Sequence, residues 1–172
     1  GAAATVSTGV TITNNTIGAP GAPTPATPPY TAPATTVYVR GIGISGATAS
    51  TITGNTIQNV ISYVGAGVAG LELTSAIGAG PINVNNNTIT NVVQHSGSFY
   101  ARGLSLASAS GTYTAARNTI TNIQNFSGSP SNQPNGIFAS TPATSATIEL
   151  NKVTTVYNRS TGTFGVQGVT LT

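Results

Sequence analysis

The residues that could carry chemistry are few. The chain of 172 residues contains two acidic side chains, Glu72 and Glu149, one histidine, His95, and neither aspartate nor cysteine. Glycoside hydrolysis uses two carboxylates held at a defined separation on either side of the scissile bond. A Ser-His-Asp triad requires an acidic partner for its histidine. Glu72 falls at an outward position of a predicted strand, and Glu149 lies close enough to Lys152 for a local ion pair. We therefore predict no catalytic residue and no enzyme activity.

Metal and cofactor sites lack their usual residues. One histidine without cysteine or aspartate does not provide the set of side chains that holds zinc. Residues 65–70 match G-x-G-x-x-G, but the following residues alternate like a strand, whereas a dinucleotide site needs a helix there. No acidic residue follows about 20 positions later, as that site also requires. We predict no metal and no cofactor.

Charge is scarce and dispersed. Only 4% of the residues are charged, and the pI of about 9.6 reflects the lack of acids rather than a basic patch. Nucleic-acid binding requires clustered Lys and Arg, and a membrane helix requires about 20 consecutive apolar residues. The sequence has neither feature, so we predict neither nucleic-acid binding nor membrane insertion. With so few ionisable groups, we also expect no buried charge pair.

An asparagine phrase repeats along the chain. Its type is N-x-[IV], and successive copies are 40, 32, 31 and 33 residues apart. The asparagines are Asn15, Asn55, Asn87, Asn118 and Asn151.

A glycine phrase of the type G-[ILV]-x-[LIV] interleaves with the first, with Ala139 at the last position of the fourth copy. Its copies are 29, 33, 33 and 32 residues apart. The glycines are Gly41, Gly70, Gly103, Gly136 and Gly168. Two independent markers with one period of about 32 residues indicate a repeat protein.

Each repeat carries short β-like segments that cannot bury their apolar side chains alone. Stacking the repeats places like residues above one another and buries a continuous core. We predict an all-β, right-handed parallel β-helix of about five coils with almost no α-helix, forming a single domain over residues 1–172. Asparagine suits a coil corner because it tolerates the αL conformation and can bond the next asparagine. Glycine suits a second corner with positive φ or close backbone approach. The proline-rich residues 18–36 are predicted to form a surface loop.

The two phrases resemble the right-handed parallel β-helix repeat proteins of the pectate-lyase-like superfamily, and most closely the exported surface and fibre proteins of bacteria. The resemblance covers nearly the whole chain. It implies an extracellular or cell-surface location. Lyases of this superfamily typically use acidic calcium ligands and an Arg or Lys base; aspartate is missing from this chain, so their activity is not implied. A β-helix serves many activities, so the likeness predicts fold more firmly than function.

Two functional hypotheses follow. The first is a non-enzymatic stalk or fibre subunit that stacks head to tail with copies of itself into filaments. Strand-like residues near both ends favour it, because open coil edges expose unpaired backbone groups. These assembly residues are Ala4, Val6, Val169 and Leu171.

The second hypothesis is a glycan-binding adhesin module whose partner is a polysaccharide. Aromatic residues recur in the variable loops between the two phrases, where binding residues commonly lie. The candidate residues are Tyr63, Tyr100, Phe126 and Tyr157.

Overall fold

The computed structural model describes ten stretches of the chain: residues 7–18, 38–45, 47–63, 66–74, 80–95, 99–107, 112–126, 132–140, 145–159 and 165–172. Within these stretches the regular structure consists of strands, and no α-helix is present. The predicted assembly residues Ala4 and Val6, and nearly all of the proline-rich segment, lie outside them.

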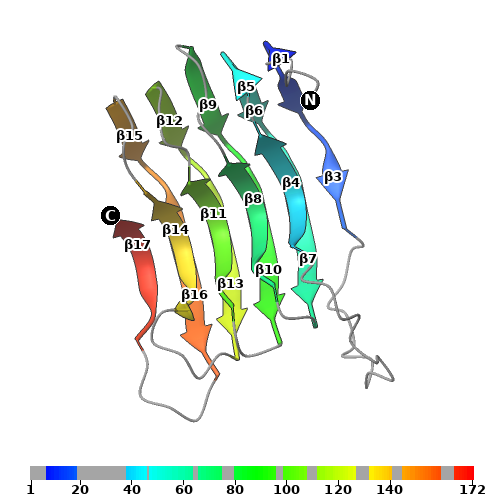
Figure 1. Cartoon of the computed structure of the whole chain (residues 1–172), viewed down its shortest axis with the longest axis vertical. Helices are drawn as coiled ribbons and strands as arrows, with labels where there is room; N and C mark the ends of the chain where they lie inside the picture. Colours follow the sequence, from blue (N-terminus) through cyan, green and yellow to red (C-terminus); the bar gives the residue numbers. More distant parts are fainter. Residues whose placement is uncertain are drawn as a thin grey trace, which may run out of the picture.

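The strands form three five-stranded parallel sheets (Figure 1). The first sheet contains β2 (Thr11–Thr13), β6 (Thr51–Thr53), β9 (Pro81–Asn85), β12 (Thr112–Ala116) and β15 (Ser145–Glu149). The second sheet contains β3 (Thr16–Ile17), β7 (Thr56–Ser62), β10 (Thr88–Gln94), β13 (Thr119–Asn125) and β16 (Lys152–Asn158). The third sheet contains β4 (Val39–Ser45), β8 (Val68–Thr74), β11 (Ala101–Ala107), β14 (Asn135–Ala139) and β17 (Gln167–Leu171). A separate pair joins β1 (Ser7–Thr8) to β5 (Ala47–Thr48).

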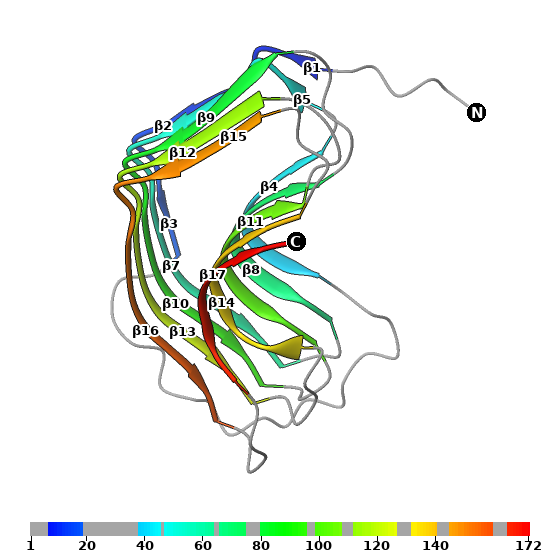
Figure 2. The ribbon, with the colours of Figure 1, turned by 90° about the vertical axis from the view of Figure 1, so that its left-hand side faces the viewer.

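The chain winds through the three sheets in turn, so the protein is an all-β parallel solenoid, as predicted (Figure 2). Each repeat contributes one strand to each sheet. Three turns are enclosed by neighbours on both sides, which is fewer than the five coils predicted. The difference arises because, among the described residues, the first and last repeats each have a neighbouring repeat on one side only.

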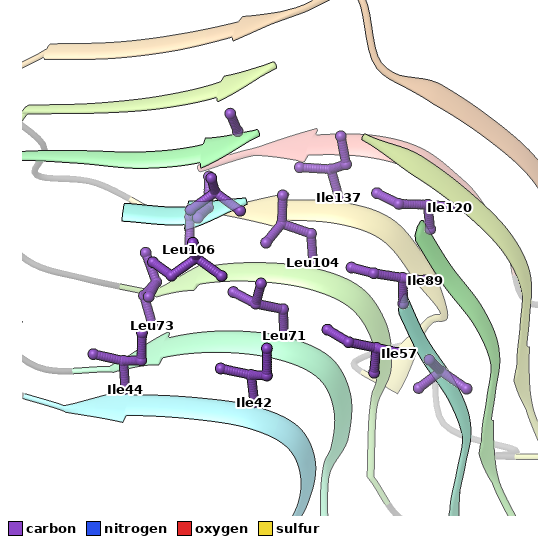
Figure 3. Packing of buried hydrophobic residues seen from close by; sticks show 14 of the residues in the cluster. Ile42, Ile44, Ile57, Leu71, Leu73, Ile89, Leu104, Leu106, Ile120 and Ile137 are labelled. Atoms are coloured by element: carbon purple, nitrogen blue, oxygen red, sulfur yellow. The ribbon is translucent and has the colours of Figure 1, made fainter. Parts of the chain in front are cut away.

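Identical phrases align in continuous columns across the sheets. Ile57, Ile89 and Ile120 pair in the second sheet, and each is fully buried. Leu71 and Leu104 pair in the third sheet and face that isoleucine column (Figure 3). The core is therefore built of apolar columns running along the stack, and a repeat is buried mainly by its neighbours.

The asparagine phrase forms a directional hydrogen-bond ladder. The backbone N–H and side-chain Nδ2 of Asn55 both donate to Oδ1 of Asn87, at 3.0 and 2.9 Å. Asn87 donates in the same way to Oδ1 of Asn118, at 3.0 and 3.0 Å. A second Nδ2 hydrogen of Asn87 reaches the carbonyl of Ile52 at 3.0 Å. Each carboxamide thus joins three successive coils.

The left-handed corner lies one residue earlier than predicted. In each repeat the residue just before the ladder asparagine has positive φ; these residues are Asn14, Gly54, Asn86, Arg117 and Leu150. The ladder asparagines are absent from the positive-φ set. The chain bends from the first sheet to the second at the preceding residue. The side-chain amide of the asparagine that follows points into the solenoid, where it forms the ladder.

Of the two reasons predicted for the repeated glycines, the structure shows close backbone approach and not a corner with positive φ. Gly41, Gly70, Gly103 and Gly136 lie inside strands and have no positive φ. A Cβ on any of them would overlap a β-branched side chain and a glycine carbonyl oxygen of the next coil. The glycine is required because the second and third sheets approach closely there.

A second bend was missed by sequence reasoning. Asn59, Asn91 and Asn122 have φ near 60° in the middle of the second-sheet strands, and Thr155 has φ 60° in the last coil. Asn91 Nδ2 donates to Asn59 Oδ1 at 2.7 Å, and Asn122 Nδ2 donates to Asn91 Oδ1 at 2.9 Å. An outer asparagine row therefore accompanies the inner one.

The inner ladder gives the first prediction. Asn87→Ala should lower the free energy of unfolding by about 1–3 kcal/mol, because it leaves buried N–H and C=O groups of the neighbouring coils without partners. Chemical denaturation measures this change. Thr88→Ala, at an exposed neighbouring position, should have an effect below about 0.5 kcal/mol. Equal effects of the two substitutions would contradict the role of the ladder.

Candidate functional surfaces

The chemically capable residues are distributed over different sheets. Glu72 lies in β8 of the third sheet, Glu149 ends β15 of the first, and His95 follows β10 of the second. Glu149 is exposed, and the ion pair expected with Lys152 is not formed. The described residues contain no group of three His, Asp or Glu side chains that could hold a metal ion. They also contain no helix long and apolar enough to cross a membrane.

Glu72 is the centre of an ionic cluster on the outer face of the third sheet. Its side chain is only 3% exposed, and Oε2 forms an ion pair with Nε of Arg40 from the preceding coil. Oε1 accepts hydrogen bonds from the Tyr100 hydroxyl at 3.2 Å and from the Ser105 hydroxyl at 3.4 Å. The expectation that the chain holds no buried charge pair is therefore wrong.

Arg102 completes the ionic cluster. Its guanidinium carbon lies 3.8 Å from the ring centroid of Tyr100 and 3.4 Å from that of Phe138. Nη1 donates to the Ser105 hydroxyl at 3.4 Å. Such cation–π contacts are stronger when the cation is removed from water. Burial raises the pKa of Tyr100 to about 12, with Glu72 adding to the effect, so Tyr100 remains a neutral donor.

Two glycines make room for this cluster. A Cβ at Gly43 would approach Cδ of Arg40 to 2.7 Å, and a Cβ at Gly67 would overlap the ring of Tyr100. Arg40 and Tyr100 can therefore lie flat against the sheet and cover Glu72. The sequence gives only a weak indication of this cluster. Arg40 and Arg102 both precede a repeated glycine, but the contacts to Glu72 also depend on the absence of side chains at Gly43 and Gly67.

A planar row lies where the second-sheet strands end. Tyr63 stacks on His95 with ring centroids 4.6 Å apart and an interplanar angle of 5°. His95 stacks on Phe126, also at 4.6 Å and with an angle of 22°. Arg159 follows, 5.7 Å from the Phe126 centroid. These four residues each follow a ladder asparagine by eight positions, so the repeat itself builds the row.

The candidate glycan-binding residues do not form one platform. Tyr63 and Phe126 belong to the planar row, and Tyr157 lies beside it, 5.9 Å from the guanidinium carbon of Arg159. Tyr100 belongs to the ionic cluster on the third sheet. Both faces of His95 and one face each of Tyr63 and Phe126 are occupied by stacking. Sugar rings bind to aromatic faces, so the geometry leaves limited stacking area.

The last described coil exposes residues that are interior elsewhere. Val169 pairs with Ile137 and is 51% exposed, and Leu171 pairs with Ala139 and is 69% exposed. Ile137 and Ala139 themselves are buried. The edges of β15, β16 and β17 have no further strand in the described structure. We call this surface the open end.

The ionic cluster gives the second prediction. Arg40→Gln should lower the free energy of unfolding by about 1–3 kcal/mol, because Glu72 remains a buried carboxylate without its cation. Partial exposure of Arg40, at 32%, keeps the expected loss below that of a fully buried pair. The double variant Arg40→Gln/Glu72→Gln should recover part of the loss. Additive losses in the double-mutant cycle would show that the two side chains are not coupled.

The planar row gives a prediction for pH. Burial, followed by the charge of Arg159, lowers the pKa of His95 below 6.5. The unfolded chain therefore binds a proton more readily than the folded chain between that lowered value and 6.5. Stability should be full above about pH 6.5 and should fall as the pH drops through this window.

Thermal unfolding from pH 7.5 to pH 5 measures the change, and the single histidine gives an unambiguous NMR titration. His95→Phe retains a stacking ring without a proton site and should remove this part of the pH dependence. A His95 pKa at or above 6.5 would contradict the prediction.

The chain was compared with protein-family models, with curated proteins and with solved structures, and none of the three comparisons gave a match. The parallel β-solenoid architecture and its surfaces are thus the basis for assigning a function.

Proposed function

We propose that this protein is a non-enzymatic structural module: an extracellular β-solenoid stalk or fibre subunit, which stacks head to tail with copies of itself. The observation that carries the proposal is the open end. Val169 and Leu171 continue the apolar columns of the core but face solvent. Exposed apolar side chains beside unpaired strand edges are the surface on which a further coil can add.

The rest of the molecule supports a structural role. The ionisable residues Glu72 and His95 are occupied in intramolecular contacts, Glu72 in the ionic cluster and His95 in the planar row. Both contacts link neighbouring coils rather than line a site for a small molecule. The resemblance of the repeat phrases to exported bacterial surface proteins supports a location outside the cell.

Contact between unlike ends favours a filament over a closed dimer. A surface that meets a different surface on the next copy leaves one of each exposed after every addition, so growth does not stop by itself. With parallel strands about 4.8 Å apart, each added coil lengthens the rod by one strand spacing.

The glycan-binding alternative remains a prediction. Tyr157 is exposed beside the planar row, and it is the aromatic residue there with the greatest access to a ligand. The stacked faces of the neighbouring rings reduce the area that a sugar could use. Binding to cell-wall polysaccharide that is lost in Tyr157→Ala, with the fold retained, would favour this second function.

The proposed function predicts concentration-dependent assembly. The purified chain should form elongated particles in electron micrographs, and its mass by light scattering should rise with concentration. Val169→Glu should hold the protein monomeric, because it places a charge on the apolar end surface. Circular dichroism should show its strand content unchanged, since Val169 is half exposed.

Thr88→Lys is the matched control. Thr88 is exposed on the second sheet and occupies the column in which the last coil carries Lys152. The substitution should leave assembly unchanged. A wild-type chain that remains monomeric at millimolar concentration would refute the proposal.

A further inference from the structure

Gly168 differs from the other repeated glycines in one respect. A Cβ at Gly136 would overlap Val153 and the carbonyl oxygen of Gly168, both of which belong to the next coil. The same relation holds for Gly41, whose Cβ would overlap Ile57 and the carbonyl oxygen of Gly70. A Cβ at Gly168 would meet nothing within 4 Å, and Gly168 has no positive φ. The described fold therefore places no requirement for glycine at position 168.

We infer that Gly168 is a contact residue of the open end, and that its partner is the first coil of a second copy of this chain, seated with Ile17 and Gly41 over Gly168. This inference rests on the proposed function and specifies its interface. Glycine becomes necessary at 168 only when a β-branched side chain and a glycine carbonyl lie above it. Ile17 and Gly41 are the residues that hold these places in the first turn.

The inner asparagine ladder supports the same partner. Each ladder asparagine donates toward the following coil and accepts from the preceding one. Within the described residues, Asn151 accepts from Asn118 at 2.9 Å but has no following Oδ1 to receive its backbone N–H. Asn15 donates to Asn55 at 3.0 Å, and its own Oδ1 accepts no described hydrogen bond. The last coil thus presents a hydrogen-bond donor, the backbone N–H of Asn151, and the first coil presents an acceptor, Oδ1 of Asn15.

The apolar columns match as well. Continuing the observed register places Val169 beside Ile42, Leu171 beside Ile44 and Val153 beside Ile17. Two like ends cannot reproduce this arrangement, because two donor ends or two acceptor ends would face each other. The ladder therefore fixes the polarity of the contact.

The absence of cysteine allows a direct test by cross-linking. Thr11 and Thr147 are exposed and lie in one outward column of the first sheet. In the inferred contact, Thr147 of one copy lies beside Thr11 of the next at about one strand spacing, within the Cα separation that a disulfide accepts. The single variants Thr11→Cys and Thr147→Cys should form a mixed disulfide when combined. Thr13→Cys, two residues out of register, should not replace Thr11→Cys.

Gly168→Ala, added to the Thr147→Cys chain, is the decisive variant. The thermal unfolding of the monomer should be unchanged, because the added Cβ enters open space. The yield of mixed disulfide should fall about tenfold or more, because the Cβ collides with the coil of the second copy. Gly165→Ala is the matched control, since its Cβ would have only ordinary contacts of 3.6 Å or longer with Gln133. It should leave cross-linking intact.

The outcomes separate the inference from the proposed function. Assembly with undiminished cross-linking in Gly168→Ala would overturn the inference and leave filament formation standing. Disulfides formed predominantly between two Thr147→Cys chains, or between two Thr11→Cys chains, would overturn the polarity. A wild-type chain that does not assemble, together with cysteine variants that do not cross-link, would overturn both and would leave a coil of another polypeptide as the occupant of the open end.

Discussion

The structure depends on the pairing of buried asparagine amides between successive coils. Asn87 is 1% exposed, and its amide bonds to the coil before and the coil after its own. A buried amide without partners is costly, so every coil must align its asparagine with that of its neighbour. This requirement sets the register of all three sheets at once, because the apolar columns follow at fixed positions from the asparagine.

The ionic cluster adds a second constraint, on which coils lie next to each other. Successive coils are so alike that a shift by a whole repeat would still pair asparagine with asparagine and isoleucine with isoleucine. Arg40, Glu72 and Arg102 are not repeated in the same way, and the contacts of Arg40 with Glu72, of Glu72 with Ser105 and of Arg102 with Phe138 join particular coils. Buried polar groups can specify one arrangement among near-equivalent ones. The charged residues, although few, distinguish coils that the repeat alone would leave interchangeable.

The repeat period and the buried columns could be predicted from the sequence because they depend on spacing alone. Ile57, Ile89 and Ile120 lie inside as the pattern requires. The left-handed corner was misplaced onto the asparagines, since both residues of a pair such as Asn86 and Asn87 suit that conformation. The ionic cluster was missed for a different reason. It depends on the reach of Arg40 and Tyr100 across neighbouring coils, and spacing within a single repeat does not contain that information.

The direction of the strands has a mechanical consequence. The covalent backbone runs around the solenoid, whereas the interstrand hydrogen bonds and the asparagine ladder run along its length. Tension along the rod is therefore carried first by non-covalent contacts, with all three sheets and the ladder between two coils sharing the force, because the backbone joins successive coils through only one connection in each repeat. A sideways load is carried by the backbone itself. Extensibility and rupture along the axis are thus set by the weakest boundary between coils, and the loss of one boundary need not unravel the next.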